Sequence, residues 1–372
     1  MAGLTKRQTN FELLKIISAL LIVSFHCVYH GGFTYTDTFS ASQWLLKEFW
    51  LLGQLGVNLF MIISGYFMVN SQFRKDKLVK LVFGVYFYHL LSCLVAWFTG
   101  NLDGRQISDL LLAFLFPITR RIYWYITVYL MIYLFSPFIN KFIHSLSQKA
   151  FATLLIITFI LWSVLPTISG WAIGVESDLY YYNRFVWCLV VYLWGAYIRL
   201  YSLSVIKSKK SSLILAGTSF LLSSLAIPVL AFCNSFLPIS IEPAYFWRPN
   251  TVLTMLTCIG LFGVAMHAKT PDWKWIPVVS STSLGIYLLH DGNLRNFLWQ
   301  RVFPNAQHQA SPFLILYILF AILVVFLLGV GIDLLRQQLE KWLVKLLLPR
   351  KTPGIRKICT DLLAKIYRVF NI

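Results

Sequence analysis

Long apolar runs alternate with short polar segments along almost the whole chain. The runs long enough to cross a bilayer lie at 11–30, 50–70, 80–99, 122–140, 150–166, 184–201, 211–233, 249–267, 276–290 and 311–333. A transmembrane helix requires about 20 consecutive, mostly apolar residues. The pattern therefore predicts an all-α, polytopic membrane protein with about ten transmembrane helices. A run at 106–118 is too short to span, and we predict that it forms an interfacial or re-entrant segment.

The composition excludes a soluble globular domain. Of the 372 residues, 58% are hydrophobic and 12% are charged, whereas about 25% of the residues in a soluble domain are charged. Most Lys and Arg residues lie in segments on the same side of the predicted membrane as the N-terminus, and this is the positive-inside pattern. We therefore predict that both termini are cytoplasmic. Because topology accounts for the net charge of +18, we expect no nucleic-acid partner.

The last apolar run marks the predicted domain boundary. Residues 1–335 are predicted to form the integral-membrane domain, and residues 336–372 form a basic, amphipathic cytoplasmic tail. Such tails are typical of helices that lie on the anionic inner leaflet, so we expect membrane lipids as partners. The six cysteines have neither metal nor disulfide spacing, and we expect no metal. The chemistry is therefore expected in the membrane domain.

Glu12, Lys15 and His26 lie within the first apolar run. The eleven steps from Lys15 to His26 come within about 20° of whole helical turns, so both side chains share one stripe. Glu12 lies one turn before Lys15 and can pair with it. Charge in hydrocarbon costs several kcal/mol, which favours a functional role. The alternative is that Glu12 and Lys15 snorkel to the headgroups while His26 packs between helices.

A basic cluster follows the second run and consists of Arg74, Lys75, Lys77 and Lys80. Lys77 and Lys80 lie one turn apart if a helix begins here. Such a cluster suits a ligand with several phosphates. Ordinary positive-inside anchoring also explains it.

Small residues in the second run, Gly53, Gly56 and Gly65, favour close contact with a neighbouring backbone, and Ser64 can hydrogen-bond across that contact. Helix packing alone explains this pattern equally well.

Aromatic and histidine residues mark the predicted outer ends of two other runs. Trp124 and Tyr125 are placed at an outer mouth, where an aromatic belt also explains them. His290 ends the run at 276–290 at about the depth of His26, so the two imidazoles are candidates for proton handling. The alternative for His290 is a structural role at a helix end.

These motifs resemble those of the integral-membrane acyltransferase-3 family, which contains the O-acetylases of bacterial surface polysaccharides. The family's first helix carries a basic residue, ten intervening residues and a histidine, matched here by Lys15 and His26. A phrase like LFFxxSGF is matched by LFMIISGY at 59–66, and an Arg-x-x-Arg motif by Lys77 and Lys80. Three later phrases follow in the same order: WYITVYLMIYLFSP, VVYLWGAYIRLY and TSLGIYLLH.

The resemblance implies transfer of an acyl group, with acetyl favoured, from cytoplasmic acyl-CoA to a hydroxyl of a cell-surface or lipid-linked glycan. It implies a multi-pass protein of the bacterial cytoplasmic membrane. Lys replaces Arg in both basic motifs. This keeps the positive charge but loses the guanidinium, which can donate two parallel hydrogen bonds to one phosphate or carboxylate. Because no hydrolase-like domain follows the last run, capsule or exopolysaccharide is favoured over peptidoglycan.

The expected site follows from the residues and the resemblance together. We expect three catalytic residues: His26 as the general base, together with Lys15 and Glu12. The alternative is a relay in which His26 itself carries the acyl group. Acetyl-CoA is expected at the basic cluster. The acceptor is expected at Ser64, Tyr66, Trp124, Tyr125 and His290. The alternatives are a lipid-linked glycan flippase and a membrane sensor module without turnover.

Overall fold

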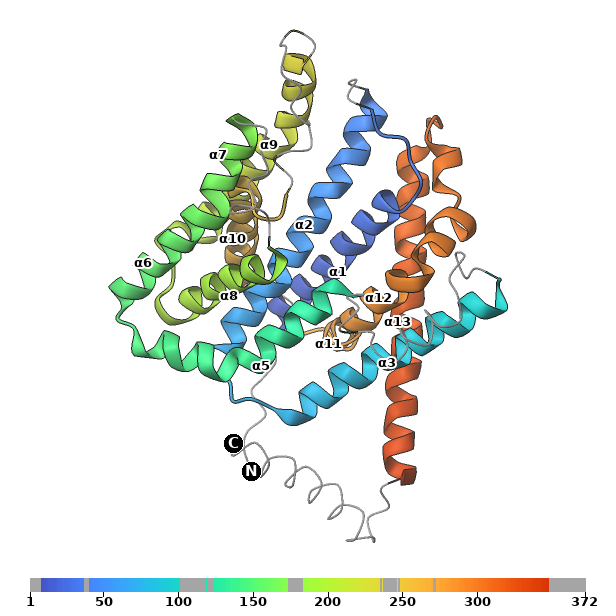
Figure 1. Ribbon diagram of the computed structural model, residues 1–372, viewed down its shortest axis with the longest axis horizontal. Coiled ribbons are helices and arrows are strands. Elements are labelled where there is room, and N and C mark those ends of the chain that lie inside the picture. Colours follow the sequence, from blue (N-terminus) through green and yellow to red (C-terminus); the bar gives the residue numbers. More distant parts are fainter. Residues whose placement is uncertain are drawn as a thin grey trace.

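The structure is a computed structural model in which every regular element of the described residues is a helix (Figure 1). It describes residues 8–36, 40–100, 123–172, 183–234, 248–269 and 272–347, together with 118, 236 and 246. The helices are α1 (Thr9–Tyr29), α2 (Ala41–Met68), α3 (Lys75–Phe98), α5 (Trp124–Ser145), α6 (Gln148–Phe159), α7 (Leu165–Ala172), α8 (Arg184–Tyr201), α9 (Lys209–Asn234), α10 (Val252–His267), α11 (Trp275–Ser280), α12 (Ser283–His290) and α13 (Leu314–Leu347).

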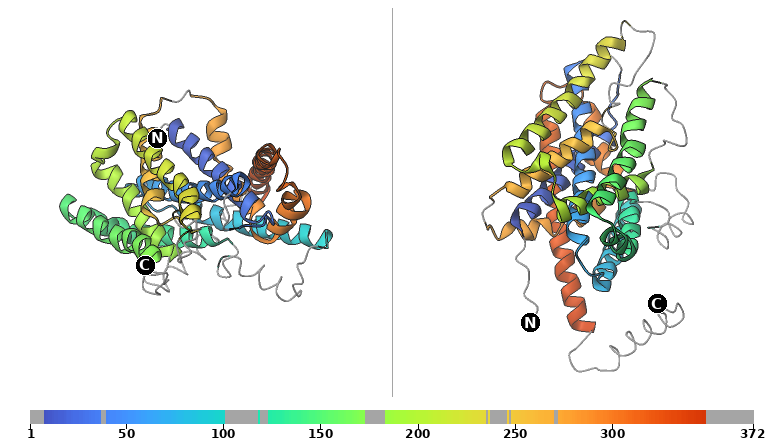
Figure 2. Two further views of the ribbon diagram at one scale, coloured as in Figure 1. Left: turned by 90° about the horizontal axis from the view of Figure 1, so that it is seen from above. Right: turned by 90° about the vertical axis from the view of Figure 1, so that its left-hand side faces the viewer.

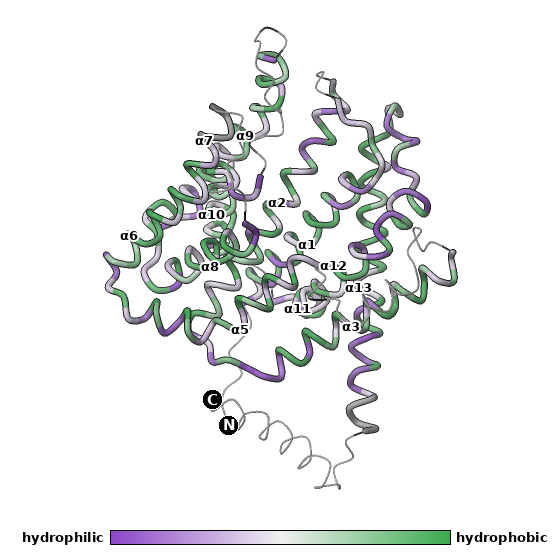
Figure 3. Tube along the Cα trace, in the orientation of Figure 1, coloured by the Kyte–Doolittle hydropathy of each residue, from purple (hydrophilic) through white to green (hydrophobic). Residues whose placement is uncertain are grey.

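The described helices confirm an all-α polytopic membrane protein. Seven of them are long and apolar enough to cross a bilayer. On α13 the exposed apolar residues include Leu316, Phe320, Leu323 and Leu327, which recur at helical spacing and form a lipid-facing stripe. Hydrophilic residues gather at the start of α3 and on the lower part of α13 (Figure 3). The count of about ten spans and the cytoplasmic termini stay predictions. Of the run at 106–118, residues 106–117 lie outside the described residues.

The centre of the bundle is α1, which contacts α2, α10, α11, α12 and α13. Glycines allow α2 to lie close to its neighbours, as predicted. A Cβ at Gly56 would lie 2.6 Å from the Ser18 carbonyl oxygen of α1. A Cβ at Gly65 would overlap the carbonyl group of Tyr192 on α8. These contacts hold α1, α2 and α8 together and fix the depth of the polar side chains of α1.

The run predicted at 276–290 is divided into α11 and α12. The polar side chains at the break bond back to preceding carbonyl groups: Ser281 to Val278 and Thr282 to Val279, both at 2.7 Å. Such bonds compete with the regular helical ladder. The break gives α12 its own direction, and α12 ends at His290 beside α1.

The helices α2 and α13 exceed their predicted lengths by the most. The first, α2, begins at Ala41, where Ser40 accepts a hydrogen bond from the Gln43 amide at 3.2 Å. The other, α13, continues to Leu347, and its lower part extends beyond the other helices (Figures 1 and 2). The predicted boundary at 335 therefore falls within a continuous helix, and residues 348–372 lie outside the described residues.

Candidate active site

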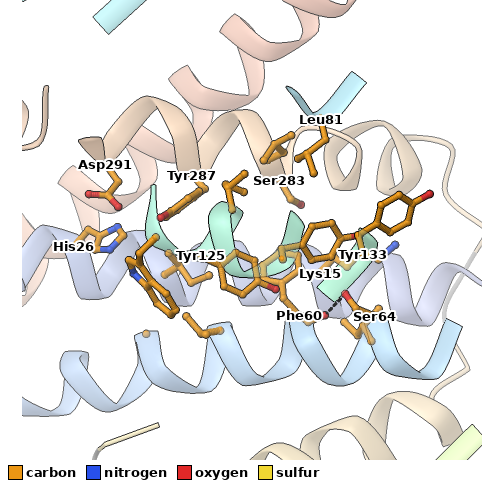
Figure 4. Close-up of a pocket in the computed structure, with 18 of the residues that line it drawn as sticks. Lys15, His26, Phe60, Ser64, Leu81, Tyr125, Tyr133, Ser283, Tyr287 and Asp291 are labelled. Carbon is orange, nitrogen blue, oxygen red and sulfur yellow. Dashed lines mark hydrogen bonds between the residues drawn. The ribbon is translucent and has the colours of Figure 1, made fainter. Parts of the chain in front are cut away.

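A cavity of about 1370 Å³ lies among α1, α2, α3, α5, α12 and α13 (Figure 4). Its lining includes residues from both ends of the bundle, and we call the end where α1 begins the inner end and the other the outer end. Lys15 lines the inner part and His26 the outer part, separated by about 16 Å of helical rise. Pockets for one small ligand usually have about 300–1,000 Å³. The cavity therefore has room for two substrates that meet inside it.

Two histidines form a buried pair at the outer end. The Nδ1 atom of His26 lies 2.8 Å from the Nε2 atom of His290, and the exposed fractions of the residues are 6% and 0%. His290 Nδ1 donates to the Ile286 carbonyl oxygen. His26 lines the cavity and His290 lies behind it, outside the lining. The predicted proximity of the two imidazoles is therefore present, but His290 is not in a position to touch a substrate in the cavity.

The hydrogen-bond chain defines the tautomers of both rings when both are neutral. A carbonyl oxygen only accepts, so His290 Nδ1 carries the hydrogen and His290 Nε2 has the lone pair. His26 Nδ1 must then be the donor to His290. The lone pair of His26 is therefore on Nε2, the atom that is free to take a proton. This arrangement fits a general base, a nucleophile or a metal ligand.

The carboxylate of Asp291 lies beside His26, as Figure 4 shows. Ligand atoms of His26, His30 and Asp291 lie within 4.8 Å of one another, which is a spacing that can hold a metal ion. The Arg295 guanidinium, however, lies 3.9 Å from Asp291 Oδ1 and gives that carboxylate a counter-charge. The site therefore does not require a cation for charge balance, and the absence of a metal stays a prediction.

Tyr287 lies next to His26 and Asp291 in the cavity lining (Figure 4). Its ring centroid is 6.1 Å from that of His26. Its hydroxyl is buried and has no hydrogen-bond partner among the described residues. A buried donor without a partner costs about 1–3 kcal/mol, which suits a site that binds an oxygen atom of a substrate. In the sequence, Tyr287 is marked only by its place in the phrase TSLGIYLLH.

At the inner end, Lys15 Nζ lies 3.2 Å from Glu12 Oε1, so the predicted pair is present. Ser280 of α11 also donates to Glu12. Glu12 and Lys15 both line the cavity. The carboxylate is therefore anchored from two sides and holds the Lys15 ammonium toward the cavity.

The basic cluster after α2 is divided by the fold. Lys77 and Lys80 line the cavity, whereas Arg74 and Lys75 are not among its lining residues. The Arg74 guanidinium bonds to Asp76 at 3.1 Å, and this bond raises the pKa of Arg74 above its ordinary value. The helical spacing of Lys77 and Lys80 thus places both on the cavity side, while the charge of Arg74 is already paired.

Further cations complete the inner end: Arg199 of α8 and Arg336 and Lys341 of α13. Arg336 Nε donates to Asp333 at 2.7 Å, and Asp333, with 1% exposed, is buried. The spacing of Asp333, Arg336 and Glu340 is the i, i+3 and i+4 pattern of a helical ion-pair network. That pattern was a usable sequence signal for Arg336.

The predicted acceptor residues have different surroundings. Trp124, Tyr125 and Ser64 line the cavity, and the Ser64 hydroxyl donates to the Phe60 carbonyl at 2.8 Å. Tyr66 is buried and does not line the cavity. Its hydroxyl accepts a hydrogen bond from Arg199 at 3.2 Å, so Tyr66 positions an inner cation.

The model of the acyltransferase-3 family, described as an acyltransferase domain, matches residues 8–330. The chain belongs to the acyltransferase-3 family. No curated protein and no solved structure matches this membrane acyltransferase at a significant level. The match includes α1 to α12 and the first half of α13. It therefore contains both histidines and all the inner cations named above except Arg336 and Lys341.

Proposed function

We propose that this membrane acyltransferase transfers an acyl group, with acetyl favoured, from cytoplasmic acyl-CoA to a hydroxyl of a surface glycan. The observation that carries the proposal is the His26–His290 pair, which leaves His26 Nε2 as the basic atom beside a cavity with room for two substrates. The proposal includes a location in the cytoplasmic membrane of a bacterium and a capsular or exopolysaccharide acceptor.

The donor enters from the inner end in this proposal. The phosphates of acyl-CoA carry several negative charges, and Lys and Arg bind phosphate by charge-assisted hydrogen bonds. Lys15, Lys77 and Lys80 supply such groups from α1 and α3. The pantetheine arm then extends along α1, and the thioester reaches the region of His26.

The acceptor enters from the outer end. His26 Nε2 takes the proton of the glycan hydroxyl while that oxygen attacks the thioester carbonyl carbon. The Tyr287 hydroxyl is placed to donate to the oxyanion of the tetrahedral intermediate. When the intermediate collapses, the carbon–sulfur bond breaks, and the imidazolium of His26 gives its proton to the departing thiolate. The products are the acylated glycan and free CoA.

Acetyl content of the surface glycan tests the proposal. Proton NMR is run on glycan from cells that carry the wild type, His26→Ala or no protein, with equal membrane levels of the two proteins. We expect an acetyl signal with the wild type alone. Unchanged acetyl in all three, together with less glycan at the surface when the protein is missing, would overturn acyl transfer in favour of transport.

A further inference from the structure

The outer end of the cavity is lined by arginines and by a group of aromatic side chains. The arginines are Arg184, Arg248 and Arg295. The aromatic residues of α1 and α2 at this end are Phe25, Tyr29 and Trp50, and we call them the aromatic wall. The Phe25 and Tyr29 rings stack, with centroids 4.9 Å apart and planes inclined by 14°. The Trp50 ring lies 5.7 Å from that of Tyr29. The aromatic wall is therefore one continuous surface built from two helices.

An aromatic belt at the membrane surface does not account for this wall. Belt residues lie at headgroup level on the surface that faces lipid, whereas all three rings line the cavity. Contacts behind the wall fix its rings. A Cβ at Gly53 would lie 2.1 Å from the Phe25 Cβ, so the glycine makes room for that side chain. Trp50 Nε1 donates to the Tyr35 hydroxyl at 3.3 Å. Tyr29 is 52% exposed, so the wall is held from behind and accessible in front.

A polar side chain, Gln54 of α2, lines the cavity next to the aromatic wall. The helices α1 and α2 are consecutive and antiparallel (Figure 1), and Gly53 contacts Phe25. Gln54 and His26 each follow one member of that contact, so their depths differ by about 3 Å of helical rise. The Gln54 side chain forms no hydrogen bond within the described part of the chain. An amide with two donor hydrogens and an acceptor oxygen is therefore available at the depth of His26.

The aromatic wall and Gln54 match the two kinds of surface on a sugar ring. The face of an aromatic ring carries partial negative charge, and it attracts the C–H groups on the apolar face of a pyranose, which carry partial positive charge. The hydroxyls at the edge of the sugar both donate and accept hydrogen bonds, and so does a glutamine amide. A pyranose that lies on the Tyr29 ring can therefore turn its hydroxyl edge toward Gln54 and His26.

We infer that the aromatic wall and Gln54 form the acceptor subsite, which binds one pyranose ring by its apolar face and by one hydroxyl and so presents a neighbouring hydroxyl to His26. This inference rests on the proposed acyl transfer and specifies how the acceptor is recognised. Tyr29 and Trp50 bind the face of the sugar, and Gln54 orients its edge. These residues bind and position the acceptor and take no part in proton transfer.

The first test removes the aromatic face. Full-length protein in phosphatidylcholine nanodiscs is given labelled acetyl-CoA and surface glycan from cells that lack the protein, and the KM for each substrate is measured. Tyr29→Leu should raise the KM for glycan about 10-fold, whereas Tyr29→Phe keeps the ring and should stay within about twofold of the wild type. An unchanged KM for acetyl-CoA shows that each variant is folded. Phe313→Leu is the matched control, because Phe313 is 67% exposed just before α13 and does not line the cavity.

The second test removes the amide. Gln54→Leu should raise the KM for glycan about 10-fold, since one hydrogen bond has an effect of about this size. Gln54→Asn keeps an amide and should recover part of the affinity. Gln307→Leu is the control, because Gln307 is exposed at the same end and does not line the cavity.

Two results would overturn the inference while leaving the proposed transfer intact. One is a glycan KM for Tyr29→Leu and Gln54→Leu that equals the KM of their controls. The other is a Tyr29→Phe protein as weak as Tyr29→Leu, which would mean that the hydroxyl and not the ring face binds the sugar. A wild type that acylates no glycan would instead refute the proposed transfer, on which the inference rests.

Discussion

The two ends of the cavity are both positively charged, but they are built differently. The inner end has Lys15, Lys77 and Lys80 together with arginines of α8 and α13. The outer end has arginines and aromatic residues and lies beside the histidine pair. Lysines on the cytoplasmic side are also what topology requires, so inner charge alone is ambiguous. The positive-inside pattern does not explain positive charge at the outer end. The outer charge is therefore more informative about the substrate than the inner charge.

The largest expected effect is on the chemistry at the outer end. His26→Ala removes the proposed base and should lower kcat about 10³-fold, within the usual range for general acid–base catalysis. The KM for acetyl-CoA should change little, because the donor's phosphates bind at the inner end. Steady-state assays of the protein in nanodiscs measure both values. His308→Ala, at the same end but outside the cavity lining, serves as the control, and a His26→Ala protein with full kcat would exclude the base role.

Tyr287→Phe should lower kcat about 10²-fold, because loss of one oxyanion donor has effects of this order. Tyr317→Phe is a matched control: its hydroxyl is also buried with no hydrogen-bond partner among the described residues, and it does not line the cavity. Single-turnover release of CoA gives the rate of the chemical step for both variants. If the two variants are equally active, Tyr287 has no role in stabilising the intermediate.

His290→Phe should lower kcat about 30-fold, since His26 would lose the acceptor that fixes its tautomer. His290→Gln keeps an acceptor oxygen and should recover part of the activity. The pH dependence of kcat distinguishes positioning from packing, since a purely structural residue would leave its midpoint unchanged. A result in which the two variants have the same kcat and an unshifted pH profile contradicts the proposed role of His290 in positioning His26.

At the inner end we expect a change in donor affinity. The double substitution Lys77→Gln and Lys80→Gln should raise the KM for acetyl-CoA about 10-fold and leave kcat nearly unchanged, because two phosphate contacts are lost far from the thioester. Lys141→Gln, an exposed change on the same side, is the control. An effect on the KM for glycan in place of the KM for acetyl-CoA would reverse the assignment of the two ends.

The smallest expected effect comes from chelation. His26, His30 and Asp291 have a spacing that can hold a metal, yet the proposed transfer needs none. Overnight dialysis against EDTA should therefore leave kcat within about twofold of its starting value, given that a catalytic metal contributes several kcal/mol. A loss of activity that Zn²⁺ or Mn²⁺ restores would assign a metal to this cluster.

The sequence was sufficient for features that depend on local periodicity. The stripe that joins Glu12, Lys15 and His26 follows from the geometry of one helix, and so does the cavity side of Lys77 and Lys80. The pairing of His26 with His290 followed from the estimated depth of two runs in the membrane. The separation of Arg74 from the cavity could not be predicted, because its bond to Asp76 depends on where α3 begins.

Residues brought together by tertiary packing were missed. Arg184, Arg248 and Arg295 lie on separate segments, and no spacing along the chain indicates that they share a cavity. Arg336 could have been predicted from the sequence, since its spacing from Asp333 and Glu340 is that of a helical ion-pair network. The division between α11 and α12 was also readable in principle, because consecutive Ser and Thr residues compete for helical carbonyls.

A single cavity lined from both ends of the bundle has a consequence for the permeability of the membrane. A continuous water path would let protons flow down the membrane potential, at about 2.3 kcal/mol per charge for each 100 mV. The midsection is lined by the rings of Phe60, Tyr125 and Tyr287 (Figure 4). In the proposed transfer the acyl chain passes these rings, and the same side chains would then also limit the flow of protons through the cavity.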